Sequence, residues 1–315
     1  MSTKKISLIS PAVPVLDAEA ENRREFPTIL PRKHPWWYIS GAILIIAMLW
    51  FFTSLAQNPN IDYGTIRAYF TRDVILAGVG NTLLMAAISM IFAVLLGTAL
   101  AVMRLAGGPV WSAFSWGYVW FFRSVPLLVL IIFCGNLALL TDRLGIAIPF
   151  TETYLFSVPT NAVMTAFVAS IVALSLHEAA YMAEIIRSGI MSVSAGQRDA
   201  TKALAIPGYK AFFLVIMPQA MRIIIPPTGS SVINTIKATS LVSVIAGSEL
   251  LTRVENIAAT NLKTIEMLLV ACLWYLIIAS VAGVGQYYLE RKYGRGFSRS
   301  NVKKMPPRAP VSSAE

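Results

Sequence analysis

Long uncharged apolar stretches alternate with shorter polar segments along most of this chain. A membrane helix needs about 20 consecutive apolar residues to cross the roughly 30 Å hydrocarbon core of a bilayer. Six stretches approach or exceed that length and predict transmembrane helices at residues 36–56, 79–103, 118–140, 160–186, 223–246 and 267–289. We therefore expect an all-α polytopic membrane protein with six transmembrane helices, and neither a soluble enzyme nor a disordered chain.

Prolines interrupt two of the predicted helices. Pro126 follows Arg123 in the third and is expected to kink or start a helix there, because proline lacks a backbone donor. Pro226 and Pro227, followed by Gly229, predict that the fifth cannot be a uniform helix. Irregular backbone at membrane depth is tolerated where protein or a water-filled cavity surrounds it. The fifth helix is therefore expected to line a pathway, with a simple kink as the alternative.

The basic residues are concentrated in a few segments. The 315 residues carry 26 Lys and Arg against 16 Asp and Glu, a net charge of +10. Of those 26 cations, 20 lie in the polar tails at 1–35 and 290–315, in the segment 104–123 and in the loop 187–222, whereas five lie in the opposite loops. By the positive-inside rule, we expect both termini and the loop 187–222 to lie in the cytoplasm. We expect the chain itself to lie in the inner membrane of the cell. This distribution argues for a lipid environment and against a nucleic-acid partner.

The loop 187–222 is too polar to span a membrane, yet it has helical signals. Ser194 is expected to cap a short helix that ends near Leu204, and Pro207-Gly208 then breaks it. A second short helix is predicted after the break. Four residues at helical spacing form its apolar face, namely Tyr209, Phe212, Phe213 and Ile216. Such a surface helix is either an inert amphipathic connector or a docking element that a partner can grip.

Several motifs in this chain resemble those of one protein family. The family's loop carries Glu-Ala-Ala, three residues, Gly, nine residues, then Ile-any-Leu-Pro. This chain has Asp199-Ala200-Thr201, Ala205, Val215 and Met217-Pro218 at the same spacing. Four further segments match in order: Gly80-Asn81-Thr82-Leu83, Arg123-Ser124-Val125-Pro126-Leu127-Leu128, Ala180 to Ile190 and Lys237-Ala238-Thr239-Ser240-Leu241. The chain thus resembles the permease subunit of bacterial ABC importers, in the polar amino-acid uptake group.

The resemblance implies a domain organisation and a set of partners. A permease domain at 76–289 contains the coupling loop 187–222 and follows an extra transmembrane helix at 36–60. The implied partners are a cytoplasmic ATP-binding subunit, a second permease copy or sister permease, and an extracytoplasmic solute-binding protein that delivers a polar amino acid. The chain itself would be no enzyme and would hold no cofactor or metal, in keeping with the lack of a Gly-Lys-Ser/Thr phosphate loop.

The coupling residues that this resemblance implies lie in the loop and are Gly196, Gln197, Arg198, Asp199, Ala200, Ala205 and Pro218. Ala205 replaces the family glycine that allows a sharp bend, and Pro207-Gly208 could move that bend by about two residues. Glu184 and Arg187, three residues apart near the cytoplasmic end of the fourth helix, are expected to pair and anchor the loop.

Placing a polar or charged side chain inside a membrane costs free energy, so each such residue needs a structural or functional reason. The substrate pathway is expected to include Glu178, Tyr181, Asn234 and Lys237. The alternative is structural: Glu178 and Lys237 pair with each other or with the backbone and hold helices together. Arg123 is either an interfacial residue that extends toward the headgroups or part of a gate.

Two other functions remain open on the sequence. A proton-coupled secondary transporter could use His177 and Glu178, but it would leave the loop motif without a role. A membrane enzyme is remote, because the chain has only two histidines, His34 and His177, and shows neither a metal-ligand cluster nor a paired nucleophile and base.

Overall fold

The chain divides into two units, residues 1–60 and 61–315, which are described separately. The computed structural model describes residues 36–147 and 154–293, so the predicted tail 1–35 and most of the predicted tail 290–315 lie outside the described residues. In the first unit, α2 (Trp36–Ala56) is a 21-residue helix without a charged side chain. Its length and composition agree with the first predicted transmembrane helix.

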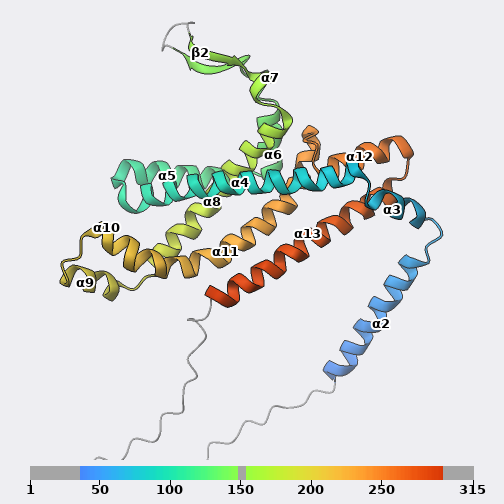
Figure 1. Cartoon of the computed structure of the whole chain (residues 1–315), viewed down its shortest axis with the longest axis horizontal. Helices are drawn as coiled ribbons and strands as arrows, with labels where there is room; N and C mark the ends of the chain where they lie inside the picture. Colours follow the sequence, from blue (N-terminus) through green and yellow to red (C-terminus); the bar gives the residue numbers. More distant parts are fainter. Residues whose placement is uncertain (1–35, 148–153, 294–315) are drawn as a thin grey trace, which may run out of the picture. The chain divides into compact units, whose positions relative to one another are not determined.

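The second unit is built mainly from helices that match the remaining predicted spans (Figure 1). Its elements in chain order are α3 (Tyr63–Phe70), α4 (Asp73–Ala106), α5 (Gly108–Ser124), α6 (Leu127–Gly135), η1 (Leu137–Leu139), β1 (Arg143–Ala147), β2 (Tyr154–Pro159), α7 (Thr160–Val163), α8 (Ala166–Met191), α9 (Ala195–Ala203), α10 (Gly208–Ala211), η2 (Phe212–Ile216), α11 (Met217–Ala238), η3 (Thr239–Ile245), α12 (Leu250–Asn261) and α13 (Thr264–Tyr293).

The described residues contain five helical segments that are long and apolar enough to cross a membrane: α2, α4, α8, the run from α10 to η3, and α13. The pair α5 and α6 passes the same test together and is a candidate sixth span in the region of the predicted helix 118–140, but it bends by 97° at its break, as a broken span or a re-entrant loop does. Val125 and Pro126 form that break, because α5 ends at Ser124 and α6 starts at Leu127. The predicted effect of Pro126 is confirmed.

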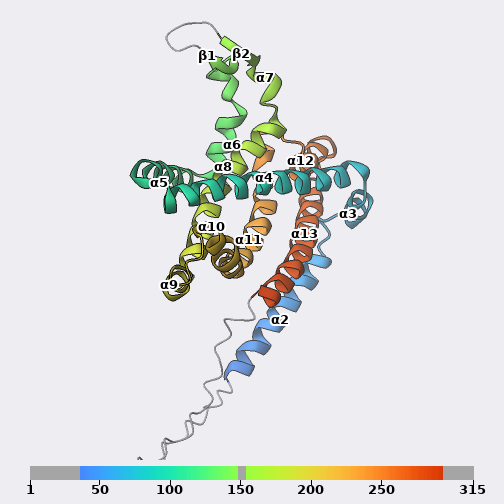
Figure 2. The same ribbon diagram turned by 60° about the vertical axis from the view of Figure 1, so that its left-hand side comes forward.

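The centre of the second unit is the crossing of α4 and α8, which is visible in both views (Figures 1 and 2). Gly97 of α4 makes this close approach possible: a Cβ there would lie 2.6 Å from the Cβ of Met182 and 3.0 Å from the carbonyl oxygen of Ala179. Small residues at such contacts let helix backbones approach closely within a membrane. Two buried clusters that share α8 extend from this contact toward α11 and toward α6.

The predicted break in the fifth span is wrong, because α11 stays helical through Pro226 and Pro227. The two prolines leave the carbonyl oxygens of Arg222 and Ile223 without their helical N–H donors, and a tertiary contact stabilises the next turn of the helix. The side-chain amide of Gln286 on α13 donates a hydrogen bond of 2.6 Å to the carbonyl oxygen of Pro226. Gly229 leaves the space for it, since a Cβ there would lie 1.6 Å from Oε1 of Gln286. Sequence spacing alone does not reveal this partner on another helix.

The polar segment before the fourth span contains an antiparallel hairpin of β1 and β2, which the apolar pattern does not predict. Its strands pair from Arg143 with Pro159 to Ala147 with Tyr154. The hydroxyl of Thr160 closes its base by donating to the carbonyl oxygen of Thr141 at 2.6 Å. In both views this hairpin and the α9–α10 loop lie at opposite ends of the second unit (Figure 2).

Candidate functional sites: the coupling loop and the Glu178 pocket

The helix α9 occupies the position that the sequence predicts for a short surface helix. It begins directly after Ser194, but the Ser194 side chain makes no capping hydrogen bond, so that part of the prediction is wrong. The predicted end near Leu204 is confirmed, because Leu204 is the C-terminal cap residue. The loop therefore presents a compact helix of nine residues, Ala195–Ala203.

The bend after α9 lies at Ala205 itself. Ala205 has a φ of +51°, in the left-handed region that favours glycine. Its amide donates to the carbonyl oxygen of Lys202, and the amide of Ile206 donates to that of Thr201. These two bonds form a Schellman motif, in which the residue at the position of Ala205 is usually glycine. Pro207-Gly208 therefore does not move the bend.

Hydrogen bonds join α9 to the ends of two long helices. The guanidinium group of Arg198 donates to the carbonyl oxygen of Ile190 on α8 at 2.8 Å. Gln219 on α11 donates to the side-chain oxygen of Gln197 at 3.5 Å and to the carbonyl oxygen of Val215 at 3.0 Å. A displacement of α9 would therefore act on both α8 and α11.

The side of α9 away from these contacts is exposed. The side chain of Asp199 is 71% exposed, and its ion pair with Lys202 is long, at 3.8 Å. An exposed pair of that kind contributes little to stability. Gly196, Gln197, Ala200 and Pro218 are also exposed. Asp199 is thus available to a partner without loss of an internal contact.

The predicted apolar face of the second loop helix is wrong in part. Phe212 and Ile216 pack against the buried cluster between α4, α8 and α11, whereas Tyr209 and Phe213 are mostly exposed. The reason is the helix type, because residues 212–216 form a π-helix. Its wider turn changes the periodicity on which the prediction rests.

A cavity of about 270 Å³ lies between α8 and α11, close to the start of α6. Three of the four predicted pathway residues line it, namely Glu178, Tyr181 and Asn234. We call this cavity the Glu178 pocket. His177 also lines it, and its ring centroid lies 5.2 Å from that of Tyr181. The pocket combines a carboxylate, an imidazole and an amide with the face of an aromatic ring.

The structure places Lys237 outside the lining of the Glu178 pocket, with an exposed side chain on the next turn of α11. Among the described residues, Glu178 and Lys237 form no ion pair. The structural alternative of a Glu178–Lys237 bridge is therefore not observed in the described part of the chain. The carboxylate of Glu178 instead lies within hydrogen-bonding reach of Ser231.

The sequence analysis missed two polar residues of the pocket, Ser231 and Thr235. Together with Asn234 they occupy one face of α11, because residues three and four positions apart are neighbours on a helix. Extending the helical spacing backward from Asn234 would have identified Ser231. Thr235 gives a weaker signal, since its hydroxyl is satisfied by the carbonyl oxygen of Ser231 at 2.9 Å.

The predicted pairing of Glu184 with Arg187 is confirmed. The two side chains are joined by a contact of 2.7 Å between a guanidinium nitrogen and a carboxylate oxygen. Arg104 at the end of α4 binds the other carboxylate oxygen at 3.1 Å. Glu184 therefore links α8 to α4, a connection between distant parts of the sequence that helical spacing cannot predict.

Comparisons with known proteins identify a family to which this chain is similar. Residues 93–295 match the family model described as binding-protein-dependent transport system inner membrane component. The arginine transport system permease protein ArgU of Corynebacterium glutamicum is 41% identical over 271 residues, which cover 86% of this chain and 84% of that protein. The glutamate/aspartate import permease protein GltK of Escherichia coli is 32% identical, and the match covers 69% of this chain and 92% of GltK.

A solved structure shares the fold of the second unit. It is described as the crystal structure of an amino acid ABC transporter with histidines, and it aligns with a TM-score of 0.62 at 26% sequence identity. The alignment covers 74% of this chain and 99% of that one.

Proposed function

Because this chain belongs to the family of binding-protein-dependent transport system inner membrane components, we propose that the Glu178 pocket lies on the path of the transported amino acid and that α9 receives the motion of the ATPase subunit. The chain is the inner-membrane permease of an ABC amino acid import system. ATP hydrolysis belongs to a separate subunit, and a solute-binding protein is the other partner that this family implies.

The carboxylate of Glu178 is the observation that supports the pocket most strongly. A charged group at membrane depth is costly and usually faces a cavity or a partner. Glu178 lines a cavity and has no cationic partner among the described residues. It is thus suited to the ammonium group of an amino acid, while the neighbouring hydroxyl and amide groups of Ser231, Asn234 and Thr235 supply further polar contacts.

A cationic amino acid suits this pocket best. The permease ArgU, which is 41% identical, is named for arginine transport. Its substrate carries a guanidinium group in addition to its ammonium group. The lone carboxylate of Glu178 offers charge attraction for such groups. We assign L-arginine or a close analogue as the substrate class.

The loop is the second part of the proposal. Gly196, Gln197, Asp199 and Ala200 would contact the ATPase subunit, and Arg198 would pass the motion to α8 through its bond to Ile190. Closure of an ATPase pair on ATP would displace α9, and α8 and α11 line the Glu178 pocket. Movement of a rigid helix at one end of the unit could therefore open the pocket to alternate sides.

The proposed assembly has two permease chains, either two copies of this one or a sister pair. Both termini and the α9 loop face the cytoplasm, as the distribution of Lys and Arg indicates. The hairpin of β1 and β2 lies at the other end of the unit and would face the solute-binding protein.

Uptake of radiolabelled L-arginine by cells that lack their own copy of this permease tests the pocket. Glu178→Gln should lower uptake by at least about tenfold, since it removes a charge-assisted contact. Arg67→Gln on the exposed surface of α3 is the matched control and should leave uptake unchanged. Full uptake in the Glu178→Gln variant would refute the proposal. The proton-coupled alternative predicts uptake that persists without the ATPase subunit and stops when a protonophore is added.

A further inference from the structure

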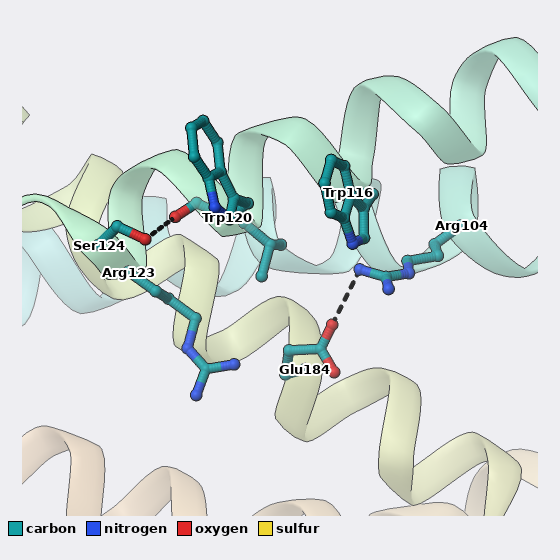
Figure 3. Close-up of a pocket in the computed structure, with 7 residues that line it drawn as sticks. Arg104, Trp116, Trp120, Arg123, Ser124 and Glu184 are labelled. Carbon is teal, nitrogen blue, oxygen red and sulfur yellow. Dashed lines mark hydrogen bonds and ion pairs between the residues drawn. The ribbon is translucent and has the colours of Figure 1, made fainter.

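A cluster of charged side chains lies where α4, α5 and α8 meet. Arg104 and Arg187 both bind the carboxylate of Glu184, at 3.1 Å and 2.7 Å. The side chain of Arg123 extends from α5 toward the same region (Figure 3). Three guanidinium groups against one carboxylate leave this cluster with a net charge of +2. The ion pairs of Glu184 therefore cannot neutralise it.

The cluster opens onto a cavity of about 350 Å³, which we call the arginine pocket. Arg104, Arg123 and Glu184 line it together with Val119 and Ser124 and with two tryptophans, Trp116 and Trp120. The indole rings of the two tryptophans are stacked, with centroids 6.3 Å apart, and both tryptophans lie on α5 with Arg123 (Figure 3). The cavity thus has a cationic floor and an aromatic wall.

The arginine pocket and the Glu178 pocket lie along the same face of α8. His177, Tyr181 and Glu184 follow one another at i, i+4 and i+7, the spacing of one helical face. Arg123 connects the two cavities, because it lines the arginine pocket while its guanidinium carbon lies 5.1 Å from the centroid of the Tyr181 ring, which lines the Glu178 pocket. One side-chain layer separates the two cavities.

We propose that the arginine pocket is a second binding station of the transport path, which receives the carboxylate of the amino acid after its ammonium group leaves Glu178. This inference rests on the proposed function of the Glu178 pocket. The two stations carry opposite charges, and a zwitterion has one group for each. Arg104 and Glu184 lie toward the C-terminal ends of α4 and α8, and α8 leads into the α9 loop, so the second station serves the cytoplasmic half of the path.

The chemistry of Arg123 supports this assignment. A guanidinium group binds carboxylates through two parallel hydrogen bonds. Among the described residues Arg123 donates no hydrogen bond, and its guanidinium carbon lies 5.1 Å from the centroid of the Tyr181 ring. Its donors are therefore free for a ligand. Glu184 holds Arg104 in place at the same time. Its negative charge also weakens the attraction between the three guanidinium groups and the carboxylate of the transported amino acid, so that this carboxylate can leave.

A lipid headgroup is the competing anion, because exposed tryptophans are common at membrane interfaces and basic pockets there bind anionic lipids. Trp116 and Trp120 are 55% and 60% exposed in the chain alone. The contact between Arg123 and Tyr181 favours the transport path, since a lipid site has no need to adjoin the Glu178 pocket. The experiment below distinguishes the two.

Fluorescence of Trp116 and Trp120 reports directly on this cavity. The complex of the permease with its ATPase subunit is placed in phosphatidylcholine nanodiscs and titrated with L-arginine and with agmatine, which lacks the carboxylate. The double variant Trp116→Phe, Trp120→Phe supplies the background. L-arginine should produce a saturable change, and agmatine should bind at least about tenfold more weakly. Arg123→Gln should weaken the binding of L-arginine by the same factor and leave the binding of agmatine unchanged. The control Arg67→Gln should alter neither affinity.

Equal responses to L-arginine and agmatine, or an unchanged response in Arg123→Gln, would overturn the inference. Binding of radiolabelled L-arginine to the same complex separates this failure from failure of the proposed function. Binding that Glu178→Gln abolishes, with no tryptophan response, contradicts the second station alone. Absence of any L-arginine binding contradicts both. Quenching by brominated phosphatidylglycerol that Arg123→Gln removes, without an L-arginine response, would reassign the cavity to a lipid headgroup.

Discussion

The guanidinium group of Arg123 lies over the ring of Tyr181, with 5.1 Å between the guanidinium carbon and the ring centroid. Arg123 lies in the last turn of α5, just before the bend at Val125 and Pro126, and Tyr181 is in the middle of α8. The ring of His177 lies 5.2 Å from Tyr181 on its own helix. The position of a bent helix is thus tied to the wall of the Glu178 pocket, so a movement of α5 would change the shape of the pocket.

The Arg123–Tyr181 contact predicts different effects for two substitutions of Tyr181. Tyr181→Phe keeps the ring and should change L-arginine uptake by no more than about twofold. Tyr181→Leu removes the ring and should lower uptake by about fivefold or more, since a partly desolvated cation–π contact is worth about 1–2 kcal/mol. Measurement of initial uptake rates at equal membrane levels checks this. Equal uptake by the two variants would show that the ring has no role.

Ala205 predicts a substitution that should stabilise the coupling loop. A non-glycine residue in the left-handed region costs about 1–2 kcal/mol, a cost that glycine avoids. Glycine in turn loses more backbone entropy on folding, which offsets about 0.5–1 kcal/mol of this gain. Ala205→Gly should therefore slow hydrogen exchange at the amide of Ile206, which donates to Thr201. Ala203→Gly, at the last residue of α9, should instead speed hydrogen exchange at this amide, because glycine destabilises a helix. Faster exchange in Ala205→Gly would contradict the Schellman geometry.

The hydrogen bond from Gln286 to Pro226 predicts a strict requirement for a small residue at position 229. Gly229→Ala should force the Gln286 amide away and lower the stability by about 1–2 kcal/mol. Gly283→Ala is the matched control on α13, because a Cβ there meets no atom within 4 Å. Thermal unfolding in detergent compares them. A midpoint for Gly229→Ala equal to that of Gly283→Ala would contradict a stabilising role for the Gln286–Pro226 hydrogen bond.

Glu249 predicts a pH dependence of stability. It precedes α12 and accepts hydrogen bonds from the amide and hydroxyl of Thr252 at 2.8 and 2.7 Å, yet burial raises the pKa of its carboxyl above the ordinary 4.5. The folded chain therefore holds this proton more tightly than the unfolded one. Its stabilising contribution is present below pH 4.5 and is lost as the pH rises through the raised pKa.

Thermal unfolding of the wild type and of Glu249→Gln from pH 4.5 upward measures that contribution. The wild-type midpoint should fall relative to the variant as the pH rises, and then the difference should become constant. Asp62 does not interfere, because hydrogen bonds from Thr65 lower its pKa and keep it ionised throughout this range. A difference between the two proteins that is independent of pH would contradict the assignment.

The spans and the coupling loop could be predicted because local signals encode them. Uncharged runs of about 20 residues mark membrane helices whatever their neighbours are. The spacing of Asp199, Ala205 and Pro218 likewise depends only on the loop, and so does the bend that Ala205 makes. Glu178, Tyr181 and Asn234 could be selected because each polar group inside a span needs a reason.

The remaining features depend on contacts between distant segments. Gln286, 60 positions later in the sequence, donates a hydrogen bond to the carbonyl oxygen of Pro226 in α11. Arg104 joins Glu184 across 80 positions, and Ser231 gains its role from a pocket shared with α8. The π-helix at residues 212–216 shifted an otherwise regular apolar pattern. The periodicity of residues within a single segment cannot predict these contacts with other segments.

The coupling of α9 to an ATPase subunit is the central claim, and co-purification tests it most directly. The tagged chain is extracted from its membrane in mild detergent, and the bound subunits are identified and counted. We expect a stoichiometric ATP-binding subunit with the wild type and with the control Glu255→Arg, which reverses an exposed charge on α12. Asp199→Arg should lose that subunit without unfolding, because Asp199 makes only one long exposed ion pair. A chain that transports L-arginine without any bound ATPase subunit would contradict the account.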